Sequence, residues 1–188
     1  MFIQTEATPN PATLKFLPGR PVAPGGTLEI LNAVEAERSP LAHRLFAVEG
    51  VTGVFFGQDF VSVTKADSSQ WNHLKPAILG AVMEHFMSGA PLLHDAGEGG
   101  GGDVDEEDFD PADAETVDTI KELLETRIRP AVAGDGGDIT FRGFRDGIVT
   151  LAMKGSCSGC PSSTATLKHG IQNLLRHFLP EVEEVRAI

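Results

Sequence analysis

The first 89 residues alternate short apolar runs with turn residues, a pattern typical of a small domain built from strands and helices. Four runs rich in β-branched or aromatic residues predict strands. They lie at residues 13–16, 26–30, 51–56 and 60–64. Turn residues at 57–59 separate the last two runs, which we expect to pair as a hairpin.

Two helices are predicted in the same part of the chain. Ser39 and Pro40 form a cap and a first-turn proline, and the apolar residues that follow keep helical spacing until Gly50. The second helix is predicted from one apolar stripe. The residues of that stripe are Trp71, Leu74, Ile78, Val82 and Phe86. Pro76 is expected either to kink this helix or to mark its true start.

The pattern from residue 115 onward predicts a second small domain, in the order helix, hairpin, helix and edge strand. A stripe at helical spacing runs from Val117 to Ile128, and Gly134 can end it. The alternating segments 138–144 and 147–153 read as a hairpin joined around Asp146 and Gly147. Its expected inward residues are Ile139, Phe141, Val149, Leu151 and Met153. A helix over 167–178 and an edge strand within 182–188 complete the domain.

The run GDGGD at 134–138 could suggest a phosphate loop, but it follows a helix where such a loop would follow a strand. We therefore interpret it as a helix end and a turn into the hairpin. The predicted fold class is α+β, with two small two-layer α/β domains. Their predicted bounds are 1–89 and 115–188.

Residues 90–114 are rich in glycine and acidic side chains and predict a flexible linker. Eleven of the 27 Asp and Glu residues lie between Asp95 and Asp118, where there is no Lys or Arg, which leaves 16 acidic and 15 basic residues elsewhere. This near balance argues against a nucleic-acid partner. The absence of an apolar run of ~20 residues argues against a membrane span. We expect a soluble protein without a leader, cytoplasmic or, as the alternative, a mature form in the mitochondrial matrix.

The candidate chemistry lies in the loop 155–161, where Cys157 and Cys160 are the only cysteines of the chain. Two intervening residues allow both sulfur atoms to face one point. Pro161 suits a first helical turn, so the thiols are expected near a helix N-terminus, which would favour the thiolate that binds metal. So few cysteines favour a metal or redox role over a disulfide framework.

Ligand counting favours a site shared between two chains. Iron–sulfur clusters and all-cysteine zinc sites take four sulfur ligands, whereas this chain has two cysteines. A two-fold symmetric homodimer would supply the missing pair, with the metal on the axis. Such a site would be exposed at the surface and labile, as expected for a cluster that must later leave.

Two other interpretations of the cysteine pair remain open. A redox dithiol also opens a helix after a strand, but the βαβ pattern of thioredoxin-like proteins is absent before Cys157. A structural zinc site would need histidine ligands, and the six histidines show no ligand spacing with the cysteines. Each histidine is expected on a helix surface or in the linker. We favour a cluster over the dithiol.

The chain also resembles a known family along almost its whole length. GDGGDITFRGFRDGIVTLAMKGSCSGCPSSTATLKHGIQNLL resembles the C-terminal domain of NifU, as found in Nfu-type iron–sulfur proteins. MFIQTEATPNPATLKFLPG, SPLAHRLFAVEGVTGVFFG and WNHLKPAI resemble the N-terminal domain of the longer Nfu proteins. The family's ligands map onto Cys157 and Cys160.

The resemblance implies a scaffold or carrier that is not an enzyme. It would bind a cluster between two subunits, usually 4Fe-4S, with 2Fe-2S less expected. It would receive the cluster from upstream assembly proteins and deliver it to apo-proteins such as lipoate synthase or aconitase. The N-terminal domain has no cysteine. We expect it to serve in partner contact or regulation, or else as a folding and solubility unit.

Overall fold

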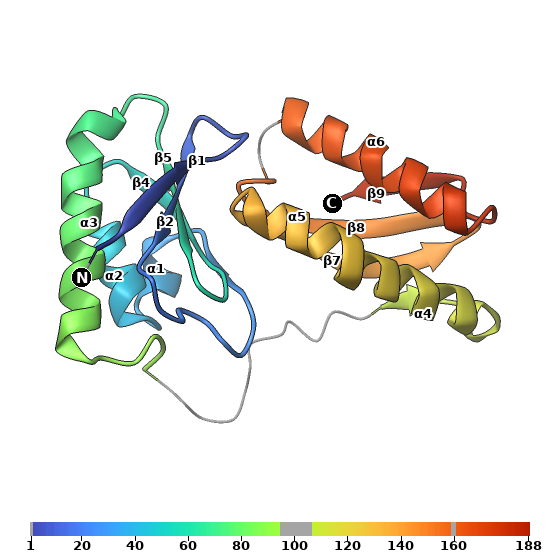
Figure 1. The fold of residues 1–188 in the computed structure, drawn as a ribbon, viewed down its shortest axis with the longest axis horizontal. Coiled ribbons are helices and arrows are strands. Elements are labelled where there is room, and N and C mark those ends of the chain that lie inside the picture. Colours follow the sequence, from blue (N-terminus) through green and yellow to red (C-terminus); the bar gives the residue numbers. More distant parts are fainter. Residues whose placement is uncertain (1, 95–106, 159–160) are drawn as a thin grey trace. The chain divides into compact units, whose positions relative to one another are not determined.

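The structure is a computed structural model that describes residues 2–94, 107–158 and 161–188 (Figure 1). It divides the chain into two compact units, 1–101 and 102–188, which we describe separately. Both units combine helices with a sheet, as the sequence predicts. The central part of the predicted flexible linker, residues 95–106, lies outside the described residues.

The N-terminal unit contains a five-stranded sheet in the order β1-β2-β5-β4-β3, and all its neighbouring strands are antiparallel. The strands are β1 (Gln4–Ala7), β2 (Thr13–Leu17), β3 (Leu28–Ile30), β4 (Val51–Phe56) and β5 (Val61–Lys65). The four predicted strands and the β4–β5 hairpin are confirmed. The edge strand β1, four residues long, is not among the predicted strands.

Helices pack against one face of this sheet (Figure 1). They are α1 (Ala33–Ala36), α2 (Pro40–Phe46) and α3 (Trp71–Ser88). Ser39 caps α2 as predicted, because its side chain accepts a hydrogen bond from the Ala42 N–H at 3.2 Å. Pro76 does not mark the start of α3, which begins five residues earlier and continues through the proline. Gly89, with φ of 68°, lies at its C-terminal cap.

The core of the N-terminal unit lies between the sheet and the helices. Phe56 and Ile78 are fully buried there, on β4 and α3. His85 is also buried, with 2% of its surface exposed, so the prediction of a surface position is wrong for this histidine. Its position continues the buried stripe of α3 three residues after Val82. The other five histidines are exposed.

The C-terminal unit contains a four-stranded mixed sheet in the order β6-β7-β8-β9. The strands are β6 (Asp108–Phe109), β7 (Gly137–Arg145), β8 (Ile148–Gly155) and β9 (Glu184–Ala187). The predicted hairpin is β7–β8, and Asp146 and Gly147 turn it with φ of 52° and 76°. Both positive values are those of the hairpin turn that an Asp-Gly pair favours. The edge strand β9 is confirmed, whereas β6 lies inside the segment predicted as linker.

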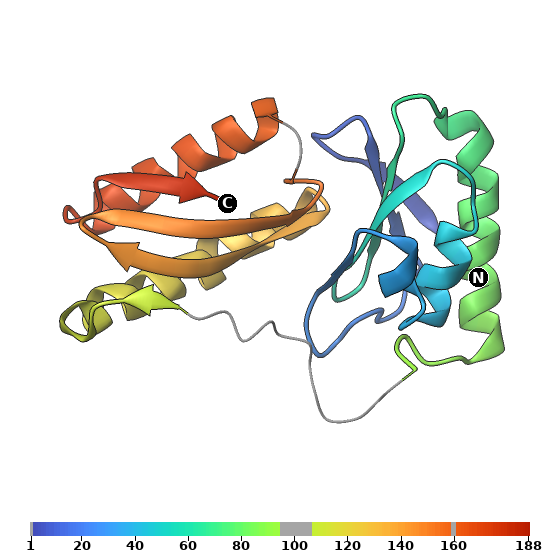
Figure 2. The ribbon, with the colours of Figure 1, turned by 180° about the vertical axis from the view of Figure 1, so that it is seen from behind.

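All helices described in this unit lie on one face of the sheet, behind it in the view of Figure 2. They are η1 (Pro111–Asp113), α4 (Ala114–Leu123), the π-helical turn η2 (Leu124–Ile128), α5 (Arg129–Gly134) and α6 (Pro161–Phe178). The five predicted inward residues of the hairpin are all buried. The single helix predicted from residue 117 to Gly134 is thus interrupted by a π-helical turn.

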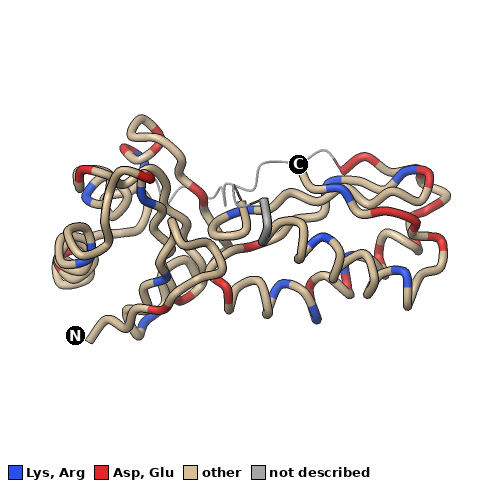
Figure 3. Tube along the Cα trace, turned by 90° about the horizontal axis from the view of Figure 1, so that it is seen from above, with Lys and Arg blue, Asp and Glu red and all other residues tan. Residues whose placement is uncertain are grey.

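Charged residues of both signs are interspersed in each unit (Figure 3). Within the described ranges, no helix combines the length and apolar character needed to cross a membrane.

Candidate functional site

The cysteine loop begins with a tight turn at the end of β8. Gly155 has φ of 69°, and its carbonyl oxygen accepts hydrogen bonds from the N–H and the hydroxyl of Ser158 at 3.1 and 3.0 Å. Thr164, in the first turns of α6, donates its hydroxyl to the Cys157 carbonyl at 2.9 Å. These bonds hold the Cys157 backbone between β8 and α6. The second predicted ligand, Cys160, lies outside the described residues.

A second segment, the turn between α5 and β7, forms a wall of the site. The Ser156 hydroxyl donates to the Asp135 carbonyl, and the Ser156 N–H donates to the Gly136 carbonyl at 3.3 Å. A Cβ atom added to Gly137 would lie 2.8 Å from Cys157 Sγ. The pattern GDGGD predicts only a helix end and a turn. The signal for this wall is the second adjacent glycine, which allows close approach of a neighbouring group.

The thiol of Cys157 is buried, with 7% of its residue surface exposed. The pKa of this thiol is raised to about 11, chiefly by burial, while a hydrogen bond with Ser156 opposes the rise and the nearby Asp135 and Asp138 carboxylates add to it. The predicted exposure and the predicted preference for the thiolate are therefore both wrong for Cys157. Desolvation of the charged form outweighs the helix N-terminus here.

A single cysteine cannot hold a metal cluster, and the surrounding described residues do not complete a site. Among the residues of known placement, no group of three or more His, Cys, Asp or Glu side chains could hold a metal ion. The remaining sulfur donors available to Cys157 are Cys160 and the cysteines of another chain. The fold and this loop define a two-unit protein with a cysteine-containing loop after a β-hairpin.

Comparison with known proteins identifies the family. The model described as "Scaffold protein Nfu/NifU N terminal" matches residues 3–89, and the "NifU-like domain" model matches 120–186. The protein named NFU1 iron-sulfur cluster scaffold homolog, mitochondrial, from Homo sapiens is 51% identical over 189 residues, which cover all of this chain and 72% of that protein. The chain belongs to the Nfu-type family of iron–sulfur cluster scaffold proteins, as the sequence resemblance implied.

Two further similarities were found. The protein of the same name from Drosophila erecta is 52% identical, and the chain spans 65% of its length. A solution structure of a NifU-like protein from Saccharomyces cerevisiae aligns with a TM-score of 0.46 and 27% identity, over 50% of this chain and 86% of that one.

Proposed function

We propose that this chain carries an iron–sulfur cluster as cargo between two copies of itself and passes it to apo-proteins. The observation that carries the proposal is the Cys157-x-x-Cys160 loop after the β7–β8 hairpin, in a member of a scaffold family. Cys157 and Cys160 of each copy would supply the four thiolates that common clusters require. The protein would act as a carrier and not as an enzyme.

The environment of Cys157 supports a carrier that releases its cargo. A buried thiol with a pKa of about 11 is protonated at neutral pH. Iron would have to displace that proton, since metal ligands bind as thiolates, so binding is coupled to proton release.

The same environment weighs against the redox dithiol. Reactive cysteines of oxidoreductases are partly exposed and have a lowered pKa, because the thiolate is the nucleophile. Cys157 is buried and has a raised pKa. It is therefore poorly suited to attack a protein disulfide.

The family resemblance and the relatives' names direct the remaining proposals. The cluster would be 4Fe-4S, with 2Fe-2S as the alternative, and the acceptors would include proteins such as lipoate synthase or aconitase. The relatives are named as mitochondrial proteins. Of our two expected locations, this supports the mitochondrial matrix more than the cytoplasm.

The test is anaerobic reconstitution with iron and sulfide of the wild type, Cys157→Ala, Cys160→Ala and His169→Ala. His169 lies on the exposed surface of α6 and serves as a control for a nearby histidine ligand. Bound iron, sulfide and molecular mass are measured on each sample, and Mössbauer spectroscopy reports the cluster type. We expect one cluster per dimer in the wild type and the control, and none in either cysteine variant.

Full occupancy in both cysteine variants, or wild-type occupancy in a monomer, would contradict a cluster shared between two chains. Turnover of disulfide substrates by the metal-free protein would instead support the oxidoreductase.

A further inference from the structure

The helix that precedes the GDGGD turn contains an irregularity with a clear local cause. Pro130 has no N–H, and in a regular helix its ring would clash with the carbonyl four residues earlier. The chain adopts the π-helical turn η2 just before it, and the Thr126 hydroxyl donates to the Glu122 carbonyl at 2.7 Å. Each residue in a helix turns the chain by about 100°, so the wider turn changes the direction of every later side chain.

Arg129, the residue after this turn, makes a two-pronged ion pair with Asp138. Its Nε and Nη2 atoms lie 2.9 Å from the two carboxylate oxygens of Asp138. Its Nη1 atom donates to Glu125 at 2.6 Å. Both carboxylates raise the pKa of the Arg129 guanidinium, so it is charged at all relevant pH values. The planar fork of arginine matches a carboxylate in a way that lysine cannot reproduce.

Asp138 connects this ion pair to the cysteine loop. It is buried, and one of its carboxylate oxygens also accepts the Ile139 N–H at 2.8 Å. It stands next to Gly137, whose added Cβ would lie 2.6 Å from the Lys154 carbonyl and 2.8 Å from Cys157 Sγ. A shift at the start of β7 would therefore move the wall against which the sulfur atom lies.

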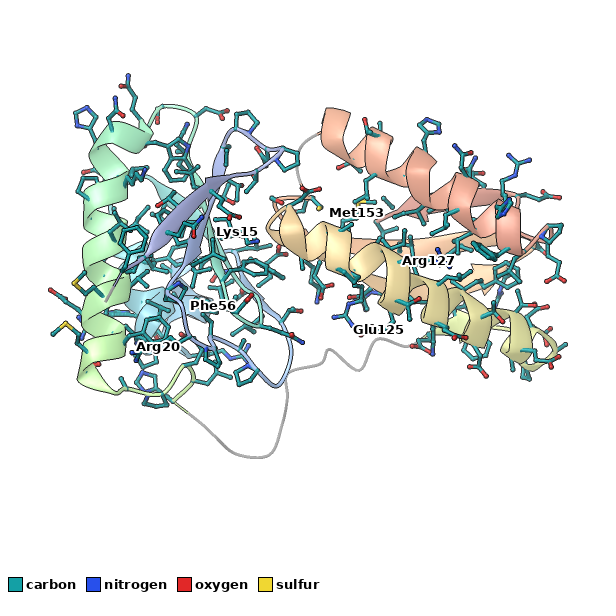
Figure 4. The ribbon with its side chains drawn as sticks, in the orientation of Figure 1. Lys15, Arg20, Phe56, Glu125, Arg127 and Met153 are labelled. Atoms are coloured by element: carbon teal, nitrogen blue, oxygen red, sulfur yellow. The ribbon has the colours of Figure 1, made fainter. Side chains whose placement is uncertain are left out.

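We infer that Arg129 is a positioning residue for the cluster site, which it sets through Asp138 and Gly137. The inference rests on the proposed function. Arg127 provides a matched control on the same turn, because its guanidinium lies 5.2 Å from the centre of the Phe178 ring in α6. Figure 4 shows Arg127 on the side of the helix toward α6 and Glu125 on the opposite side.

The test uses the full chain with Arg129→Lys, Asp138→Asn, the double variant and Arg127→Lys. Hydrogen exchange of the peptide 152–158 in the metal-free protein reports the position of the loop. Bound iron and the half-life of the cluster against a chelator report the site. We expect each single variant at the ion pair to accelerate exchange in this peptide and to shorten the half-life about tenfold, the lower range for partners of metal ligands.

The double variant should be no worse than the more affected single variant, because both changes break one interaction. Arg127→Lys should match the wild type. Unchanged exchange and half-life in Arg129→Lys would overturn the inference, as would faster exchange spread equally over α6. Absence of a cluster from the wild type would contradict the proposed function alone, since exchange in the metal-free protein still reports the positioning.

Discussion

The two units share one local arrangement but differ in what it presents. In each, a hairpin is followed by an 18-residue helix, β4–β5 by α3 and β7–β8 by α6. In each, a glycine at the start of the hairpin leaves space that is filled by a side chain from the loop before the helix. We call this space the glycine seat. A Cβ added to Gly50 would lie 2.3 Å from Ser69 Oγ, and one added to Gly137 would lie 2.8 Å from Cys157 Sγ.

The two units share the backbone arrangement around this glycine but differ in the side chain that fills the space. The glycine seat and the hydrogen bonds of the loop occur in both units, since the Ala66 N–H donates to the Gly50 carbonyl at 2.7 Å much as Ser156 donates to Gly136. Only the C-terminal unit places a thiol in the seat. The hairpin and helix therefore provide the same space in both units, and only in the C-terminal unit is the residue in it a ligand of the proposed cluster site.

The largest expected effect comes from separating the units. Each has its own core of buried residues, so we expect each to fold alone. A fragment of residues 107–188 should bind cluster as the full chain does, and a fragment of residues 1–94, which has no cysteine, should bind none. Bound iron and sulfide after reconstitution measure this directly. Failure of the longer C-terminal fragment would assign the N-terminal unit a part in the site.

A shorter fragment sharpens this test. Residues 115–188 lack β6, which pairs with β7, and Phe109, whose ring lies 6.5 Å from that of Phe141. Loss of this partly buried ring should cost on the order of 1 kcal/mol of unfolding free energy. Chemical denaturation of the two fragments compares them, and equal midpoints would show that β6 adds no stability.

The next effect comes from filling the two glycine seats with Gly137→Ala and Gly50→Ala. Each added methyl overpacks its seat, and Gly50 also has φ of 102°, which disfavours alanine. We expect each change to destabilise its own unit by about 1–3 kcal/mol. Only Gly137→Ala should also lower cluster occupancy.

Hydrogen exchange of the full chain assigns the loss of stability to a unit, and bound iron reports the site. Gly170→Ala is the control, because nothing lies within 4 Å of its added Cβ in α6. It should stabilise the C-terminal unit by about 0.5–1 kcal/mol. Reduced cluster occupancy in Gly50→Ala, or unchanged occupancy in Gly137→Ala, would contradict the proposed division between the units.

The sequence predicts those parts of the fold that depend on local pattern. Asp146 and Gly147 identify the β7–β8 hairpin because their turn fixes the register, and the apolar stripes identify α3 and α6. The strand β6 is two residues long within an acidic run, and it forms by pairing with a strand about 35 residues later. No local pattern carries that information.

In the candidate site, too, some features follow from the local sequence and others depend on distant residues. The spacing of Cys157 and Cys160 predicts sulfur ligands, and it remains a prediction for Cys160, which lies outside the described residues. The raised pKa of Cys157 depends first on burial and then on Asp135 and Asp138, which the fold brings to the loop from about 20 residues earlier. The π-helical turn was missed because an apolar stripe tolerates one extra residue.

The smallest expected effect is a pH dependence of stability in the N-terminal unit, caused by His85. Burial lowers the pKa of this side chain from its ordinary 6.5, and the charge of Arg44 lowers it further. Its Nδ1 atom has no hydrogen-bond partner among the described residues. The unfolded chain takes up a proton near pH 6.5, whereas the folded N-terminal unit resists it. The contribution of neutral His85 to the stability of the folded N-terminal unit is therefore fully present above pH 6.5 and is lost as the pH falls below it.

The measurement is the melting temperature of the 1–94 fragment between pH 7.5 and about pH 5, for the wild type, His85→Leu and His73→Leu. His73 is exposed on the same helix and is the control. Leucine cannot take up the proton and removes the unpaired buried nitrogen, so we expect His85→Leu to lose less stability on acidification. The control should follow the wild type. An equal decline of the melting temperature in all three proteins would show that His85 does not make the stability of the N-terminal unit depend on pH.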